Sequence, residues 1–236
     1  MDFGSFLFYN FFMGMNTRGI FITATGTDVG KTYVSALLLK KMQMLGLISG
    51  YYKPAMSGVC LDVPSDVQYV QQYAGLSSDK VSVSYSFEEP ISPHLAARRG
   101  SIDINLDKIL ADYSSFVNKL DYVVVEGAGG ITCPFNLNEN KLLLPDVIKA
   151  LKLDALVVAD AGLGTINSTV LTCEYAKLQG INVKGIILNN FDESNLMHQD
   201  NLVQVERLTG VNVVSTVKSS AKELDIDNEV LKGLFE

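Results

Sequence analysis

Cysteine is scarce in this sequence, and the few that occur are far apart. There are three among the 236 residues, Cys60, Cys133 and Cys173, and no two of them form a C-x-x-C pair. An odd number at such wide spacing argues against a disulfide framework and against a zinc site. Reduced, half-buried cysteines of this kind are typical of cytoplasmic proteins, and we expect that location here.

An excess of positive charge is also missing. The sequence has 19 lysines and arginines against 26 aspartates and glutamates, which gives a net charge of −7 with neutral histidines. Because nucleic-acid binding requires a basic face that neutralises phosphates, this balance argues against a general nucleic-acid-binding protein. Local binding of a nucleotide remains compatible with it.

A segment that could span a membrane is not evident, and we expect no membrane association. The aromatic-rich run over residues 3–15 is too short to cross a bilayer, has no basic leader and lacks a small-residue cleavage site. No repeat, low-complexity tract or linker rich in proline and glycine divides the chain. We therefore expect residues 1–16 to form a flexible N-terminal extension and residues 17–236 to form a single domain.

The sequence does contain a large apolar fraction, 47%, with only 19% charged residues, which excludes intrinsic disorder. Short β-branched runs alternate with longer stretches of helical period. Several runs, such as YVVVE, are apolar without alternation, as expected of parallel strands covered on both faces. This pattern predicts an α/β protein with an open, mainly parallel sheet and helices on both faces. The candidate strands are residues 19–24, 49–53, 122–126, 155–160, 183–189 and 211–217, and the candidate helices are residues 31–45, 104–120, 145–151, 167–179 and 196–208.

Residues 24–32, with the sequence A-T-G-T-D-V-G-K-T, follow the first candidate strand and open the first long helix. In a phosphate-binding loop, glycines let successive N–H groups and the helix N-terminus point at one anion. Lys31 would reach the β- and γ-phosphates, and Thr32 would offer its hydroxyl to Mg²⁺. The strict G-x-x-x-x-G-K-[ST] pattern is not met, because Thr25 stands five positions before Gly30. We interpret the segment as a variant P-loop.

Two other candidate strands end in a charged side chain. Glu126 closes an apolar strand and precedes a run of glycines, so its carboxylate can face the P-loop and bind Mg²⁺ directly or through water. Lys53 closes the strand in Y-Y-K-P-A-M-S-G, where Pro54 prevents continuation, and can neutralise charge on a transferred phosphoryl group. From spacing alone, Lys53 is equally compatible with a solvated surface lysine. Asp66 offers another carboxylate that could reach a metal, although a lone aspartate at such a place is more often a helix N-cap or a surface acid.

Taken in order, these segments resemble the dethiobiotin synthetases, which catalyse the penultimate step of biotin synthesis. The resemblance covers about residues 20–190 and implies a P-loop NTPase-type fold of about seven strands and a homodimer. It also implies that 7,8-diaminopelargonic acid reacts with CO₂ to a carbamate, which ATP phosphorylates before the second amine closes a ring, giving dethiobiotin, ADP and phosphate. The segments that carry the resemblance are T-G-T-D-V-G-K-T, Y-Y-K-P-A-M-S-G, Ser65-Asp66, the S-P-H at residues 92–94, V-E-G-A-G-G, and G-L-G-T-I-N at residues 162–167.

The resemblance further implies roles for individual residues. Lys31 and Lys53 would be catalytic and would stabilise the carbamate and the phosphoryl transition state. Mg²⁺ would be bound by Thr32, Asp66 and Glu126. ATP would be bound by Thr27, Asp28, Val29, Gly30, Lys31, Thr32, Asp66, Glu126, Gly127, Ala128, Gly129 and Asn189. The substrate would contact Ser57, Gly129, Leu163, Thr165 and Asn167, the last three across the dimer interface, where a helix N-terminus suits a tail carboxylate.

The sequence departs from the family's pattern at several positions. Ala24 replaces the first glycine of the usual loop, and Asp28 is shorter than the customary acidic residue. Asn189 matches an adenine-contacting asparagine, but Asn190 replaces an expected aspartate. The last candidate strand, residues 211–217, is followed by a segment without the usual proline. We therefore expect weaker discrimination between ATP and other nucleoside triphosphates than in family members with the full base-binding segment.

Two alternative functions share parts of this pattern. Switch ATPases of the partition-protein or septum-site type have the same fold and dimerise around nucleotide. They carry a signature lysine early in the P-loop, where this sequence has Ala24, Thr25 and Gly26. Ligases of the cobyrinate-amidation type append a glutamine-hydrolysing domain, and no catalytic Cys-His pair for such a domain is apparent.

Overall fold

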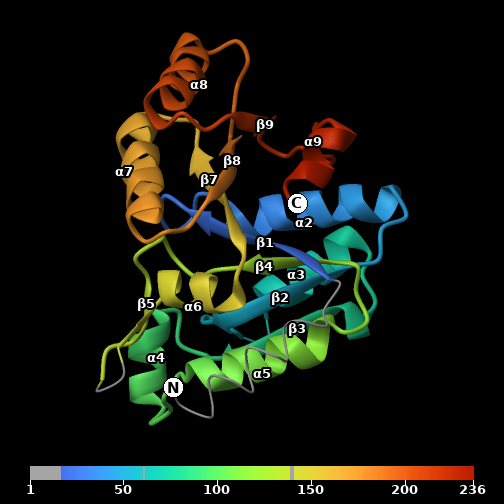
Figure 1. Ribbon diagram of the computed structural model, residues 1–236, viewed down its shortest axis with the longest axis vertical. Helices are drawn as coiled ribbons and strands as arrows, with labels where there is room; N and C mark the ends of the chain where they lie inside the picture. Colours follow the sequence, from blue (N-terminus) through green and yellow to red (C-terminus); the bar gives the residue numbers. More distant parts are fainter. Residues whose placement is uncertain (1–16, 61, 139–140) are drawn as a thin grey trace.

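The computed structural model describes residues 17–60, 62–138 and 141–236, so the extension expected over residues 1–16 lies outside the described ranges. A seven-stranded sheet of order β3-β2-β4-β1-β7-β8-β9 forms the centre of the protein (Figure 1). All of its strand pairs are parallel, which confirms the predicted α/β class. The strands are β1 (Arg18–Ala24), β2 (Ser49–Met56), β3 (Val81–Ser86), β4 (Tyr122–Glu126), β7 (Asp154–Asp160), β8 (Val183–Asn189) and β9 (Val213–Val217).

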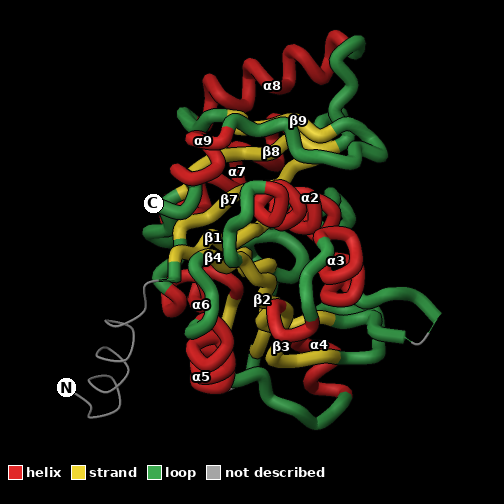
Figure 2. The backbone as a smooth tube through the Cα atoms, turned by 90° about the vertical axis from the view of Figure 1, so that its right-hand side faces the viewer, coloured by secondary structure: helices red, strands yellow, loops and turns green. Residues whose placement is uncertain are grey.

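Helices cover both faces of this sheet (Figure 2). None of the helices in the described ranges is both long and apolar enough to cross a membrane. One face is covered by α2 (Lys31–Met44), α3 (Asp66–Ala74) and α9 (Asn228–Gly233). The other is covered by α4 (Pro93–Arg99), α5 (Leu106–Val117), α6 (Leu144–Leu151), α7 (Thr165–Leu178) and α8 (Leu196–Thr209).

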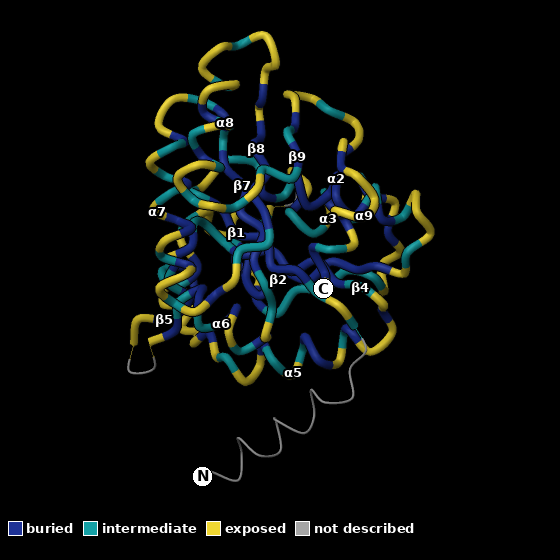
Figure 3. Tube along the Cα trace, turned by 45° about the horizontal axis from the view of Figure 1, so that its top comes forward, coloured by how far each residue is buried: buried dark blue, intermediate teal, exposed yellow. Residues whose placement is uncertain are grey.

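The apolar strands are buried because both of their faces are covered. Along β1, Phe21 packs on the side of α5 and α6, whereas Ile20 and Ile22 pack on the side of α2. All three side chains have no solvent exposure, and the strands form the dark centre of Figure 3. Burial of each such side chain contributes about 1.5–3 kcal/mol, so both layers stabilise the sheet.

One sequence expectation about the strands is wrong. Pro54 was expected to prevent continuation of β2 beyond Lys53, but the strand runs on to Met56. Pairing of β2 with β4 ends at Tyr52, and only β3 flanks the strand after that residue. The missing N–H of Pro54 therefore interrupts no pairing with β4, and a proline is tolerated there.

Several elements have no counterpart among the predicted ones. The strand β3 alternates apolar residues with serines at the sheet edge, in contrast to the continuous apolar runs of the central strands. The short helix α3 begins after a capping box, in which the Ser65 side chain and the Gln68 side chain each bond the other residue's backbone N–H. The other elements without a predicted counterpart are α4, α9, a 3₁₀ turn (Ser78–Lys80), and a hairpin of β5 (Pro134–Asn136) with β6 (Leu142–Leu143).

Strand register brings the predicted site segments to one edge of the sheet. Ile22 of β1 pairs with Glu126 of β4, and Tyr52 of β2 pairs with Val125 of β4. Because these strands are parallel, the P-loop after β1, the end of β2 and the glycine turn after β4 all leave from the same edge. This is the edge at which ligands of open α/β sheets bind.

Candidate active site

The P-loop connects β1 to α2 and turns sharply just before the helix. Gly30 has a φ of 96°, in the left-handed region that favours glycine. Asp28 also has a positive φ of 60°, and both Thr27 and Asp28 are exposed. The Lys31 ammonium donates a hydrogen bond to the Gly26 carbonyl at 3.0 Å and so closes the loop on itself. Exposed backbone at the start of a long helix is suited to an anion.

A buried asparagine from β8 braces this loop from the side. The Asn189 amide donates a hydrogen bond to the Val29 carbonyl at 3.0 Å, and a Cβ at Gly30 would lie 2.1 Å from the same amide nitrogen. The other amide atom, Oδ1, is buried and has no hydrogen-bond partner among the described residues. Asn189 therefore supports the loop and keeps one acceptor available.

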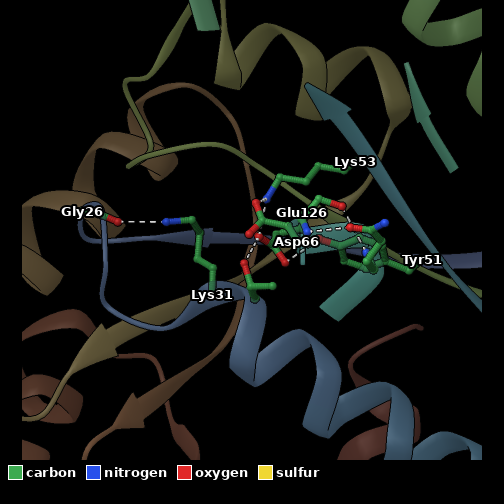
Figure 4. A network of polar contacts seen from close by, with 9 residues as sticks. Gly26, Lys31, Tyr51, Lys53, Asp66 and Glu126 are labelled. Carbon is green, nitrogen blue, oxygen red and sulfur yellow. Dashed lines mark hydrogen bonds and ion pairs between the residues drawn. The ribbon is translucent and has the colours of Figure 1, made fainter. Parts of the chain in front are cut away.

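The carboxylate of Glu126 is the centre of the polar cluster in Figure 4. It has no solvent exposure and accepts hydrogen bonds from the Thr32 hydroxyl and the Tyr51 hydroxyl, each at 2.8 Å. The Lys53 ammonium donates to the same carboxylate at 2.6 Å. Three donors from α2 and β2 therefore satisfy one buried anion, as a buried charge requires.

Lys53 is buried, so it is not the solvated surface lysine that its spacing in the sequence also allowed. Only 3% of it is exposed, and its ammonium lies 2.5 Å from Asp66 and 2.6 Å from Glu126. Burial, the largest single effect, lowers its pKa, but the charges of Glu126 and Asp66 outweigh burial, so the pKa lies above its usual value. Asp66 is the first residue of α3 rather than its N-cap, a position that Ser65 takes. The lysine is therefore positively charged and aimed at the two carboxylates.

Lys31 lies at the same edge of the sheet as Lys53 but in a different electrostatic environment. It is 8% exposed, and burial lowers its pKa, partly offset by the charge of Glu126. Figure 4 shows its side chain directed toward Gly26. A lysine with a desolvated ammonium and no carboxylate in hydrogen-bond contact can bind an anionic ligand at small cost.

The glycine turn after β4 packs closely on the P-loop. A Cβ at Gly130 would lie 3.4 Å from the Ala24 carbonyl, and one at Gly127 would lie 3.0 Å from Phe21 and from Leu144. Gly129 has a positive φ of 60°. Gly127 is buried, whereas Ala128 and Gly129 are half-buried. These small residues let the two loops approach each other.

The predicted substrate residues lie at two separate places. Ser57 is half-buried and directly follows β2, near the Lys53 cluster in sequence. Leu163 is 93% exposed, and Asn167 is exposed in the first turn of α7, which begins at Thr165 rather than at residue 167. Thr165 is 4% exposed, with its hydroxyl 3.4 Å from that of Thr169. Within the described chain, no hydrogen bond or ion pair joins residues 162–167 to Lys53, Asp66 or Glu126.

Sequence reasoning missed one residue of the cluster. A tyrosine in a buried strand is expected to serve in packing, yet the buried hydroxyl of Tyr51 donates to Glu126. Burial raises the pKa of Tyr51 well above its usual range, and the charge of Glu126 adds to this, so the hydroxyl stays protonated. The signal was the strand period: residues 51 and 53 lie two apart and point to the same face.

The fold and this edge define a P-loop nucleotide-binding protein. Two solved structures share the fold with a TM-score of 0.53. One is the signal recognition particle 54 kDa protein of Aeropyrum pernix K1 in complex with GDP, which is 16% identical, with 94% of this chain and 47% of that chain covered. The other is a chain of the MinC:MinD cell division complex of Aquifex aeolicus, which is 11% identical, with 93% of this chain and 87% of that chain covered. At these identities they show the fold alone.

Sequence comparison is more specific. The family model described as an AAA domain matches residues 18–223. The ATP-dependent dethiobiotin synthetase BioD of Clostridium botulinum (strain Loch Maree / Type A3) is 44% identical over 93% of this chain and 98% of that protein. The protein of the same name from Clostridium perfringens (strain 13 / Type A) is 43% identical over 92% and 99%. The chain belongs to the dethiobiotin synthetase family, which confirms the resemblance seen in its motifs.

The brace between Gly30 and Asn189 gives a test of the loop geometry. We expect Gly30→Ala to destabilise the protein by about 2 kcal/mol, because alanine is strained at positive φ and its Cβ would displace the Asn189 amide. For a chain of this size, that corresponds to a melting temperature lower by about 4–8 °C. Thermal unfolding followed by circular dichroism measures the shift.

The matched control is Gly26→Ala in the same loop, where a Cβ would meet nothing within 4 Å and φ is not positive. It should melt close to the unsubstituted protein. Equal melting temperatures for the two variants would contradict the brace.

Proposed function

We propose that the protein catalyses the dethiobiotin synthetase reaction at this edge of the sheet. In that reaction 7,8-diaminopelargonic acid, CO₂ and ATP give dethiobiotin, ADP and phosphate. The observation that carries the proposal is the cluster of Lys53, Asp66 and Glu126 beside the P-loop, in a chain that is 44% identical to a clostridial synthetase. The family supports ATP as the nucleotide.

ATP would bind with its triphosphate along residues 27–32 and its γ-phosphate toward Lys53. The exposed P-loop backbone and the N-terminus of α2 supply N–H donors, and Lys31 can exchange the Gly26 carbonyl for a phosphate oxygen. Residues 127–129 would flank the phosphates. The unpartnered Asn189 Oδ1 suits an amine donor on the base.

Mg²⁺ is the metal that fits the oxygen atoms present. Thr32 and Lys53 both contact one oxygen of Glu126, and Lys53 also contacts Asp66, so two carboxylates and a hydroxyl belong to one connected cluster. Mg²⁺ prefers oxygen ligands and is usually bound by one or two carboxylates together with substrate phosphates. No group of three His, Cys, Asp or Glu in the described chain holds a metal by itself, so phosphate oxygens would complete the set. Mg²⁺ bound there would offset negative charge on the β- and γ-phosphates.

The chemistry requires positive charge more than a covalent catalyst. One amine of the substrate adds to CO₂ and loses a proton, which gives a carbamate. A carbamate oxygen then attacks the γ-phosphorus, ADP leaves, and a carbamic-phosphoric anhydride forms. The second amine attacks the carbonyl carbon, and phosphate leaves as the ring closes. Because carbamate and triphosphate are both anions, Lys31 and Lys53 would act by stabilising the charge that accumulates between them.

The substrate would lie between two subunits of a homodimer. Ser57 and Gly129 of one subunit would hold the diamine end, and Leu163, Thr165 and Asn167 of the other would hold the tail carboxylate. A second copy is supported by apolar side chains left exposed on this side. Besides Leu163, the α7 residues Leu171 and Leu178 are 62% and 79% exposed and lie two helical turns apart on one face.

The two alternative functions are less well supported. The likeness to a MinC:MinD chain rests on 11% identity, which shows the fold alone, and the P-loop has no early signature lysine. For the amidation ligases, two of the three cysteines, Cys133 and Cys173, are buried, and burial raises the pKa of each thiol to about 11, which disfavours a thiolate nucleophile.

The first test is the reaction itself. We expect ADP and dethiobiotin to form only when ATP, Mg²⁺, bicarbonate and diaminopelargonic acid are all present, because the carbamate is the nucleophile for phosphoryl transfer. Coupled ADP release together with mass spectrometry of the product measures this. ATP hydrolysis at the full rate without the diamine would favour a nucleotide switch and contradict the proposal.

The second test concerns Lys53. We expect Lys53→Ala to lower kcat by about 10²- to 10³-fold, with a smaller effect on ATP affinity, because the lysine is proposed to act on charge that develops during transfer. The control is Lys108→Ala, which removes a lysine paired with Asp112 on the surface. It should retain normal turnover. Near-normal kcat in a folded Lys53→Ala protein would show that Lys53 is not a catalytic residue.

The third test concerns the dimer. Lys53→Ala and Asn167→Ala proteins should each be impaired, and mixing them should restore part of the activity, because a hybrid dimer contains one site with both residues intact. Activity is measured after subunit exchange, which mass spectrometry of differently tagged chains verifies. Verified exchange without recovered activity would show that each site is built within one chain.

A further inference from the structure

The segment over residues 218–222, which follows β9, is held from two sides. On one side, the Ser219 hydroxyl donates to the Asn190 side-chain oxygen at 3.3 Å. On the other side, the Ala221 carbonyl accepts hydrogen bonds from the hydroxyls of Tyr33 and Tyr73, the latter at 3.0 Å. The segment therefore runs from the end of β8 to the first turn of α2.

The two tyrosines hold this carbonyl in a fixed geometry. A carbonyl oxygen has two lone pairs, and Tyr33 of α2 and Tyr73 of α3 use both of them. Their rings meet edge to face at 6.2 Å, and Tyr69 stacks on Tyr73 at 5.7 Å. In addition, the Lys40 ammonium donates to the Lys222 carbonyl at 2.9 Å. Loss of a single contact would leave the others in place.

Both anchors of the segment adjoin residues proposed to contact the nucleotide. Tyr33 directly follows Thr32 of the P-loop, and Asn190 directly follows Asn189, which braces Val29 and has an unpartnered buried oxygen. If ATP binds with its triphosphate on residues 27–32, as proposed above, its sugar and base would extend away from Lys53 toward these two anchors. The segment would then border the nucleoside.

We propose that Tyr33 and Tyr73 are positioning residues for the nucleoside half of ATP, because their hydroxyls fix residues 218–222 as a wall of its binding site. The inference rests on the proposed function for the place of the triphosphate. A wall ordered before binding avoids the entropic cost of ordering it on binding. The segment has no proline, and the tyrosine hydroxyls supply the restraint instead.

The test compares two ligands by titration calorimetry in the presence of Mg²⁺: ATP, and inorganic tripolyphosphate, which has no nucleoside. In the double variant Tyr33→Phe/Tyr73→Phe, we expect the Kd for ATP to rise about five- to thirty-fold, as loss of two hydrogen bonds allows. The Kd for tripolyphosphate should stay within about twofold, since the P-loop is unchanged. The single variants should show smaller shifts and replace the double variant if it does not fold.

The matched control is Tyr69→Phe, which removes a hydroxyl from the same ring cluster that is not bonded to Ala221. It should leave both affinities unchanged. Equal losses for ATP and tripolyphosphate, no loss for either, or the same loss in Tyr69→Phe would overturn the inference. So would an unsubstituted protein that binds ATP no more tightly than tripolyphosphate. Because binding is measured directly, these outcomes are separate from a failure to make dethiobiotin.

Discussion

The buried carboxylate of Glu126 is the constraint on which the rest of the site depends. An ionised carboxylate without solvent exposure is costly unless it is paired and hydrogen-bonded. Here Lys53 pairs with it at 2.6 Å, and the hydroxyls of Tyr51 and Thr32 donate to it at 2.8 Å. These donors come from β2 and from the first turn of α2, while the carboxylate comes from β4. Satisfying one anion therefore fixes the P-loop helix relative to two central strands.

The same arrangement explains how one lysine can serve in phosphoryl transfer. Lys53 is shared between Asp66 and Glu126, whose combined charge keeps its pKa above the usual value despite burial. A metal cation at these carboxylates would compete with the ammonium for the same oxygens. In the proposed reaction, the lysine is then free to face the carbamate and the γ-phosphate, while Lys31, whose pKa burial lowers, lies on the P-loop side. Two lysines with opposite environments thus border the place where anions meet.

The sequence predicts the central strands and the P-loop well, because buried parallel strands are continuous apolar runs and the loop has a local signature. It does not predict β3, which alternates apolar residues with serines at the sheet edge, or α3, a nine-residue helix of which only Val70 and Ala74 are buried. Pro54 is misleading, because a proline ends a strand only where its N–H would be paired. The contact between Asn189 and Val29 joins residues 160 positions apart, so only the folded sheet brings them together.

The fold gives a physical reason for one departure from the family's pattern, Asn190 directly after β8. The Asn190 amide donates to Asp160 at the end of β7 at 2.7 Å, and its oxygen accepts from Ser219 after β9. An aspartate at position 190 would place a second carboxylate against Asp160, and like charges in contact repel. Asparagine instead links three adjacent strand ends. Because Asp160 also accepts from the Gly162 N–H, this chain of hydrogen bonds joins the loop proposed to hold the substrate tail to the segment proposed to border the nucleoside.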